Sequence, residues 1–301
     1  MMRLAVAATP EVALPTLEWL LGNEHQLVKV ITQPDRPAGR GRNLRESAVA
    51  QWANEHQIPV VKIAQADDLP GALTDVDLVV TIAFGILIPE STLTIPRRGF
   101  INVHFSALPL LRGAAPVQRA ILQGDTQIGI SIFQLDKGMD TGPVYSTSVH
   151  EIALEENSGQ LLNRLSALVP QDLDRVLTMI SAGSPPIAQS GAGTLAPKIG
   201  KEEAKIDWSQ SSVDVVNLVR AFTPAPGAWT LWRGEKFHLT ESKISLVKLP
   251  AGEIALIEGS LLVGCGDSAI EITTVIPFGK SAMKGADWAR GARLVAGDHF
   301  E

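Results

Sequence analysis

An asparagine and a histidine two positions apart are the residues of this sequence best suited to chemistry. Asn102 and His104 lie in an apolar run, residues 101–105, that has the length of a strand. Because side chains alternate along a strand, both would project from the same face. Burying two polar side chains in such a strand costs free energy unless they are paired or used. The structural alternative is a hydrogen-bonded core histidine beside a capping asparagine.

A second polar segment, residues 135–143, carries two carboxylates. Asp136 and Asp140 either form turns together with the glycines of the segment or supply a partner for His104. A carboxylate beside an imidazole holds its tautomer and favours the imidazolium form. The spacing leaves open which of the two interpretations applies.

An asparagine, a histidine and an aspartate together suit the transfer of a carbonyl-containing group. The amide of Asn102 can donate to a developing oxyanion, an effect worth roughly 10²–10³ in rate. An imidazole such as that of His104 moves protons near neutral pH, which is worth about 10²–10⁴. No serine or cysteine is obviously placed as a nucleophile, so direct transfer is favoured over an acyl-enzyme. A zinc site is disfavoured, because Cys265 is the single cysteine and His104 has no second histidine at metal spacing.

The first half of the chain contains the elements that would position these side chains. Short apolar runs alternate with helix-like stretches such as residues 11–21 and 47–56. Continuous apolar strands separated by helices predict a Rossmann-like α/β domain with a mostly parallel sheet. In such a sheet, ligands bind beyond the carboxyl ends of the strands. The predicted strands are residues 4–8, 27–32, 60–63, 78–83 and 101–105.

Glycine-rich phosphate loops are missing from this predicted sheet. The first strand leads into residues 7–12, which lack the Gly-x-Gly-x-x-Gly turn that brings a backbone close to a pyrophosphate. The sequence therefore argues against a nucleotide-dependent redox enzyme.

The second half of the chain predicts a smaller, β-rich domain. A helical pattern over residues 161–180 is followed by a small-residue and proline stretch without periodicity, which is typical of a linker. Short apolar runs broken by Gly and Asp come later, as in a β-barrel. We expect a catalytic domain over residues 1–184, a linker over 185–204 and a barrel over 205–301.

Composition limits the partners and the compartment. The 301 residues carry a net charge of −6, so a generally basic nucleic-acid coat is excluded. The N-terminal apolar run is too short and too broken for a membrane span or a signal peptide. We expect a cytoplasmic protein without a membrane segment.

Two local basic patches contrast with this acidic background. Residues 33–45 carry four arginines against one aspartate, and residues 280–293 carry four cations against one aspartate. Glycines and prolines predict that the first patch is an irregular loop rather than a helix. It is either a solvated loop or a phosphate-binding surface, since guanidinium groups bind phosphates. Its arginines are Arg36, Arg40, Arg42 and Arg45.

Several motifs resemble those of the 10-formyltetrahydrofolate-dependent formyltransferases. They are residues 102–104, 106–109, 112–116 and 136–142. Residues 32–41, 201–208 and 220–227 are similar to segments of the bacterial members that act on methionyl-tRNA. The departures from the family pattern, Phe105, Ala107 and Leu110-Leu111, spare the three residues suited to chemistry.

The resemblance implies a reaction and its residues. The implied reaction transfers the formyl group of 10-formyltetrahydrofolate, a co-substrate, to the α-amino group of initiator methionyl-tRNA, for translation initiation and without a metal. The family's catalytic residues fall on Asn102, His104 and Asp140. Its pterin pocket falls on the loop that begins Phe84, Gly85, Ile86 and Leu87, and its folate-binding turn on Ser106, Ala107, Leu108 and Pro109.

The resemblance also implies how tRNA would be bound. The arginine that contacts the acceptor stem falls on Arg40, with Arg36, Arg42 and Arg45 beside it as further tRNA contacts. The second domain would be an OB-like barrel that contacts tRNA, and we expect a monomer. Three other functions stay open: a formyltransferase for an amino sugar nucleotide or glycinamide ribonucleotide, a hydrolase that releases formate from the folate, and a non-catalytic RNA-binding protein.

Overall fold

The computed structural model describes residues 1–38 and 43–301, which form two compact units. Unit 1 comprises Met1–Pro116, Ile128–His150 and Leu162–Pro197. Unit 2 comprises Val117–Gln127, Glu151–Leu161 and Lys198–Glu301. The domain boundaries at residues 184 and 205 stay a prediction.

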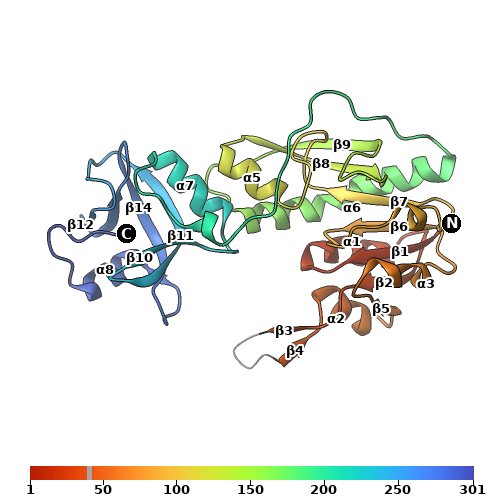
Figure 1. Ribbon diagram of the computed structural model, residues 1–301, viewed down its shortest axis with the longest axis horizontal. Helices are drawn as coiled ribbons and strands as arrows, with labels where there is room; N and C mark the ends of the chain where they lie inside the picture. The colour runs from red at the N-terminus through yellow and green to blue at the C-terminus, as the bar shows by residue number, and fades with distance from the viewer. Residues whose placement is uncertain (39–42) are drawn as a thin grey trace. The chain divides into compact units, whose positions relative to one another are not determined.

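Unit 1 is built on a seven-stranded sheet (Figure 1). In the order β5-β2-β1-β6-β7-β8-β9, the first five strands pair in parallel and β8 is antiparallel to β7. The predicted mostly parallel, Rossmann-like sheet is therefore confirmed. The strands are β1 Arg3–Ala8, β2 Gln26–Thr32, β5 Val60–Lys62, β6 Leu78–Ile82, β7 Phe100–His104, β8 Gln127–Gln134 and β9 Val144–Glu151.

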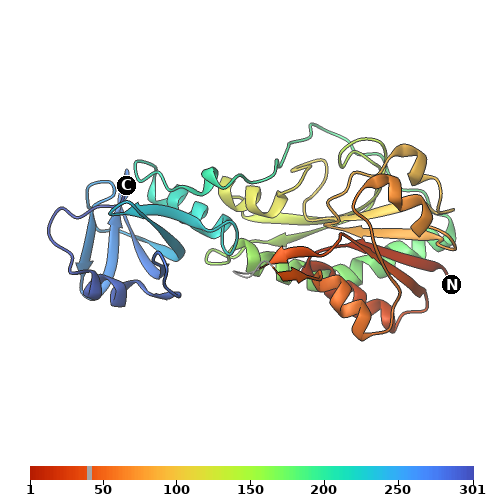
Figure 2. The ribbon, with the colours of Figure 1, turned by 60° about the horizontal axis from the view of Figure 1, so that its bottom comes forward.

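The central strands of the sheet are buried on both faces. Every residue of β6 is buried, as is every residue of β1 after Arg3. Helices lie on both faces of the sheet (Figure 2), and α1 and α2 both contact β2. Ser47 caps α2, because its Oγ accepts a hydrogen bond from Ala50 N at 3.1 Å. The helices of unit 1 are α1 Leu14–Leu21, α2 Ala48–Glu55, α3 Leu69–Ala72, α4 Glu90–Leu93 and most of α6 Ser158–Ala182. Helix α5 Pro116–Gln123 belongs to unit 2 except for its first residue.

The first basic patch contains a short hairpin where the sequence predicts an irregular loop. Strand β3 (Arg36–Ala38) pairs with β4 (Asn43–Arg45) in antiparallel fashion, and Arg36 lies opposite Arg45. The prediction fails because Pro and Gly argue against strands in general, whereas Pro is tolerated on an edge strand. Arg40 and Arg42 lie outside the described residues.

Unit 2 is an antiparallel β domain, as predicted. Its sheet has the order β10-β11-β14-β13-β12, and β15 pairs with β14. The C-terminal residues close this sheet, because Leu231 of β10 and Glu301 exchange backbone hydrogen bonds while Phe300 N donates to Gly252 O ahead of β12. The elements are α7 Ser212–Ala221, β10 Ala228–Trp232, β11 Glu235–Ser245, β12 Ile254–Ile257, β13 Ser260–Gly264, β14 Ala269–Ile276, β15 Met283–Lys284 and α8 Gly285–Ala292.

Aromatic side chains fill the core of unit 2. The ring of Phe300 stacks on Trp208 at 5.7 Å between centroids and on Trp288 at 5.9 Å, and it lies 5.0 Å from Phe237. Phe300 is therefore part of this core. In the described part of the chain, no helix combines the length and the apolarity that a membrane span requires.

Candidate active site

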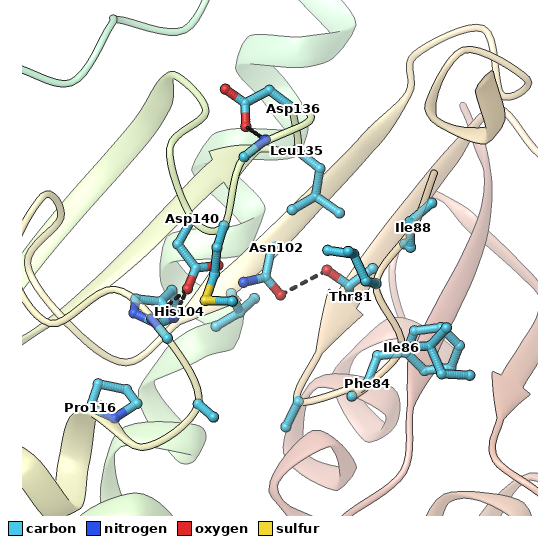
Figure 3. Close-up of a pocket in the computed structure, with 18 of the residues that line it drawn as sticks. Thr81, Phe84, Ile86, Ile88, Asn102, His104, Pro116, Leu135, Asp136 and Asp140 are labelled. Carbon is cyan, nitrogen blue, oxygen red and sulfur yellow. Dashed lines mark hydrogen bonds and ion pairs between the residues drawn. The ribbon is translucent and has the colours of Figure 1, made fainter. Parts of the chain in front are cut away.

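A cavity of about 440 Å³ lies in unit 1 at the carboxyl ends of β6 and β7 (Figure 3). This is the edge at which a parallel sheet binds ligands, and the volume falls in the range of about 300–1,000 Å³ that small-molecule sites occupy. The lining consists of Thr81, Leu93, Gly113, Ala114, Pro116, Leu135, Asp136 and residues 83–88, 102–105 and 138–140.

Asn102 presents its amide to this cavity from β7. Its Oδ1 accepts a hydrogen bond of 2.7 Å from the Oγ1 of Thr81, the neighbouring residue on β6. With the oxygen held by Thr81, the Nδ2 group faces the side of His104 and Asp140 (Figure 3). Asn102 therefore offers the cavity a hydrogen-bond donor, which is what a developing oxyanion requires.

His104 lies at the end of β7 with its ring almost fully buried. Its Nε2 is 2.9 Å from Leu111 O, and a carbonyl only accepts, so Nε2 carries the proton of this bond. Leu111 has a left-handed backbone with a φ of 55°. The remaining ring nitrogen, Nδ1, is 3.8 Å from Asp140 Oδ2. The structure thus makes Nδ1 the ring atom available for proton transfer.

Asp140 faces His104 from the loop that follows β8. Its Oδ2 accepts a 2.7 Å hydrogen bond from Gly113 N, and its backbone is left-handed with a φ of 53°. Gly113 itself has a φ of 123°, and a Cβ there would lie 2.7 Å from Ala196 O, so only glycine fits. The structure brings Asn102, His104 and Asp140 together at one cavity.

The second carboxylate of this loop forms a turn. Asp136 Oδ1 accepts hydrogen bonds from Gly138 N at 3.0 Å and from Thr141 Oγ1 at 2.7 Å. These bonds fold residues 136–141 back on themselves. The two interpretations that the sequence left open therefore both apply, one to each aspartate: Asp136 forms a turn, and Asp140 faces the imidazole.

The loop after β6 forms the apolar wall of the cavity. Phe84, Gly85, Ile86 and Leu87, the predicted pterin-binding residues, all line it. Gln33 fixes this loop, because its Nε2 donates to Phe84 O at 2.8 Å. An apolar wall of this kind suits one face of a planar heterocycle.

The predicted folate-binding turn, residues 106–109, is not among the described residues that line the cavity. Ser106 Oγ donates to Leu110 O at 2.6 Å, and Ser131 Oγ donates to Ser106 O at 2.7 Å. Ser131 also accepts from Leu108 N at 3.1 Å. These bonds fix the turn against β8, and the folate-binding role of Ser106, Ala107, Leu108 and Pro109 stays a prediction.

Two of the four predicted tRNA-binding arginines can be placed. Arg36 and Arg45 lie opposite each other on the exposed hairpin of unit 1, and the Arg36 guanidinium donates to Gln33 Oε1. Gln33 therefore contacts both the base of the hairpin and the wall of the cavity. The side chain of Arg45 is exposed.

The fold assigns the single thiol a passive role. Burial, together with the nearby Asp267 carboxylate, raises the pKa of the Cys265 thiol to about 12. A thiol with that pKa is protonated at neutral pH and is a poor nucleophile.

Sequence reasoning missed the residues that hold the trio in place. Thr81 sits inside an otherwise apolar run, and Leu111 acts through its backbone carbonyl. Gln189, whose Nε2 donates to Asp140 O at 2.9 Å, comes from the stretch predicted to be a linker. Thr81 alone carried a signal, as the polar residue of β6 beside Asn102 in the predicted parallel pairing.

Two protein-family models match this chain. A model described as formyl transferase matches residues 2–177, and one described as formyl transferase, C-terminal domain, matches residues 198–293. The chain belongs to the formyltransferase family. The two matches correspond to the parallel-sheet and antiparallel-sheet parts of the chain.

Curated formyltransferases match this chain over almost its whole length. The methionyl-tRNA formyltransferase of Thermobifida fusca is 43% identical over 308 residues, and that of Streptomyces griseus is 42% identical over 306 residues. Each comparison covers 99% of this chain and 99% of the relative. Among solved structures, HypX from Aquifex aeolicus in complex with tetrahydrofolic acid matches with a TM-score of 0.63 at 16% identity, over 96% of this chain and 47% of that one. At that identity the likeness shows the fold alone.

Proposed function

We propose that the cavity transfers the formyl group of 10-formyltetrahydrofolate to the α-amino group of initiator methionyl-tRNA, for translation initiation. The products are N-formylmethionyl-tRNA and tetrahydrofolate. The observation that carries the proposal is the convergence of Asn102, His104 and Asp140 on one cavity. The chain's identity of 42–43% with curated methionyl-tRNA formyltransferases supports this acceptor.

Asn102 stabilises the charge that forms on the formyl oxygen. The neutral amine attacks the formyl carbon, so a C–N bond forms and the carbonyl electrons move to oxygen. The Nδ2 of Asn102 donates to that oxyanion because Thr81 occupies Oδ1. A donor that is already in place needs no reorganisation during the step.

His104 and Asp140 handle the proton. The attacking nitrogen becomes positively charged and must lose one proton, while N10 of the folate must gain one as its bond to the formyl carbon breaks. Nδ1 of His104 is free to take a proton, and Asp140 at 3.8 Å stabilises the resulting positive charge. The proton balance closes within the site, and an N10-formyl group is activated enough to need no metal.

The apolar wall supports a folate site. Phe84, Ile86 and Ile88 border the cavity on the side away from His104 (Figure 3), where a pterin ring would bring N10 towards Asn102. The exposed hairpin with Arg36 and Arg45 supports binding of tRNA phosphates. Every residue of the trio belongs to this one chain, so the site needs no second copy. The protein is proposed to be a cytoplasmic monomer, and light scattering measures its mass.

An acceptor comparison tests the proposal. Purified protein and 10-formyltetrahydrofolate are incubated with methionyl-tRNA, glycinamide ribonucleotide, an amino sugar nucleotide or water alone, and formylated products and free formate are quantified. We expect formylation of methionyl-tRNA only. Dominant formylation of another acceptor, or release of formate, would replace the proposed function with one of its rivals.

Variants of the trio serve as the control for this assay. Asp140→Ala and His104→Ala each lower kcat by about 10² or more, in line with the loss of general acid–base catalysis. Folate binding, measured by fluorescence quenching, stays within about twofold, since neither side chain is part of the apolar wall. Normal turnover by either variant would remove the role proposed for it.

A further inference from the structure

The predicted linker is hydrogen-bonded to the loops that carry the catalytic side chains. Residues 187–196, here called the bracing segment, have neither helix nor strand of their own beyond isolated bridges. Arg112 N donates to Thr194 O at 2.9 Å, and Ala196 N donates to Arg112 O. Leu111 N donates to Thr194 Oγ1 at 2.8 Å. The bracing segment therefore holds the loop whose Leu111 carbonyl bonds to His104.

One side chain of the bracing segment reaches the aspartate loop. Gln189 Nε2 donates to Asp140 O at 2.9 Å and to Gly142 O at 2.8 Å. Its Oε1 accepts from Arg112 at 2.6 Å through Nη2 and at 3.2 Å through Nε. Both donors and the acceptor of the amide are thus occupied, which fixes its orientation.

The backbone of Asp140 needs external support. A left-handed φ of 53° is uncommon for a residue other than glycine and persists where the surroundings impose it. Gln189 binds the carbonyl of Asp140 and the carbonyl two residues later, so it fixes the turn on the C-terminal side of Asp140. With the backbone fixed, the carboxylate bonds to Gly113 N at 2.7 Å and faces Nδ1 of His104.

We propose that Gln189 is a positioning residue for formyl transfer, which holds Asp140 in the orientation that serves His104. The inference rests on the proposed function for its activity readout. Gln189 touches neither substrate nor reacting atoms in this role; it acts through the backbone of Asp140. Arg112 completes the arrangement by orienting the amide of Gln189.

The first test replaces Gln189 with methionine, which keeps its length and removes its hydrogen bonds. We expect kcat for formyl transfer to fall by about 10²-fold, the cost of a catalytic group displaced by about 1 Å. KM for the folate and its binding constant stay within about twofold, because the apolar wall is untouched. Gln26→Met makes the same chemical change at the first residue of β2, where Gln26 binds Arg3, and should leave kcat unchanged.

A double-mutant cycle separates positioning from general destabilisation. If Gln189 acts through Asp140, then Gln189→Met lowers kcat little further in an Asp140→Ala background. If the role of Gln189 were purely structural, the loss of kcat in the double variant would equal the product of the losses in the two single variants, and that outcome overturns the proposal. Gln189→Glu provides a second variant of the same size; it places a carboxylate against two carbonyls and should lose as much kcat.

A measurement without turnover keeps this inference distinct from the proposed function. Hydrogen exchange of the backbone amides over residues 136–142 should speed up in Gln189→Met and stay unchanged in Gln26→Met. Unchanged exchange over this loop, or wild-type kcat in a folded Gln189→Met protein, overturns the positioning role. Absence of formyl transfer by the wild-type chain would instead overturn the proposed function.

Discussion

A hydroxyl on the neighbouring strand determines which end of the Asn102 amide faces the substrate. Thr81 is buried, and its Oγ1 approaches both Asn102 Oδ1 at 2.7 Å and Ile101 O at 3.1 Å. A hydroxyl has one proton to donate, and the shorter contact indicates that Thr81 donates it to Asn102 Oδ1. Without that proton, the amide could rotate and present its oxygen to the formyl oxygen, which would be repulsive.

Replacing Thr81 with valine should therefore lower kcat while preserving the shape of the strand. The loss should approach, without exceeding, the roughly 10²–10³-fold cost of a missing oxyanion donor. Thr81→Ser keeps the hydroxyl and should restore most of the rate in steady-state kinetics. Thr16→Val is the control, because Thr16 is equally buried in α1 but its Oγ1 has no hydrogen-bond partner among the described residues. Wild-type kcat in Thr81→Val would mean that the amide is oriented by something else.

At the scale of elements, the turn 106–109 packs closely against the backbone of strand β8 at Gly129. Gly129 of β8 has no room for a Cβ, which would lie 2.4 Å from Ala107 N and 2.6 Å from Ala107 Cα. A side chain at this position must push the turn away from the strand. The packing therefore offers a way to move the predicted folate-binding turn without altering its own residues.

Gly129→Ala tests whether this turn binds folate. If it does, displacement of the turn should weaken folate binding by about tenfold or more, measured by fluorescence titration. Gly22→Ala is the matched control, because a Cβ on Gly22 would meet nothing within 4 Å. A folded Gly129→Ala protein with unchanged folate affinity would restrict the folate site to the cavity lined by residues 83–88.

The same elements show how far a sequence predicts a site. The strands that carry Asn102 and Thr81 were predictable because their other residues are mostly apolar. Strand β9 was missed because its polar residues alternate at a sheet edge. Asn102 and His104 could be placed together from their two-residue spacing on β7. The choice of Asp140 over Asp136 came only from the family resemblance, because both aspartates lie in the same polar segment.

The residues that contact this trio were not predictable. Leu111 accepts from His104 through its backbone carbonyl, and Gln189 donates to the backbone carbonyl of Asp140. The directions of these carbonyls follow from left-handed residues that lie far apart in the sequence.

At the scale of the whole molecule, the net charge of the protein has the same sign as that of tRNA, the expected partner. A protein with a net charge of −6 repels a polyanion at long range, so binding of tRNA must depend on local cationic surfaces. The hairpin of β3 and β4 is one such surface, because Arg36 and Arg45 are exposed on paired strands rather than on a loose loop. Pairing reduces the conformational entropy that the arginines lose when they bind phosphate.

Arg45→Gln should weaken binding of methionyl-tRNA and make it less sensitive to salt. Each phosphate contact contributes about 0.7–0.9 to the slope of log K against log salt, so losing one contact should make the slope shallower by that amount. Arg175→Gln removes an equally charged side chain from α6, where the guanidinium is bound to Asp172, and should leave the slope unchanged. Filter binding between about 50 and 200 mM salt covers the range in which phosphate contacts dominate. Equal slopes for Arg45→Gln and the wild type would exclude a phosphate contact at this arginine, and the electrostatic contribution to tRNA binding would then have to come from other cations of the chain.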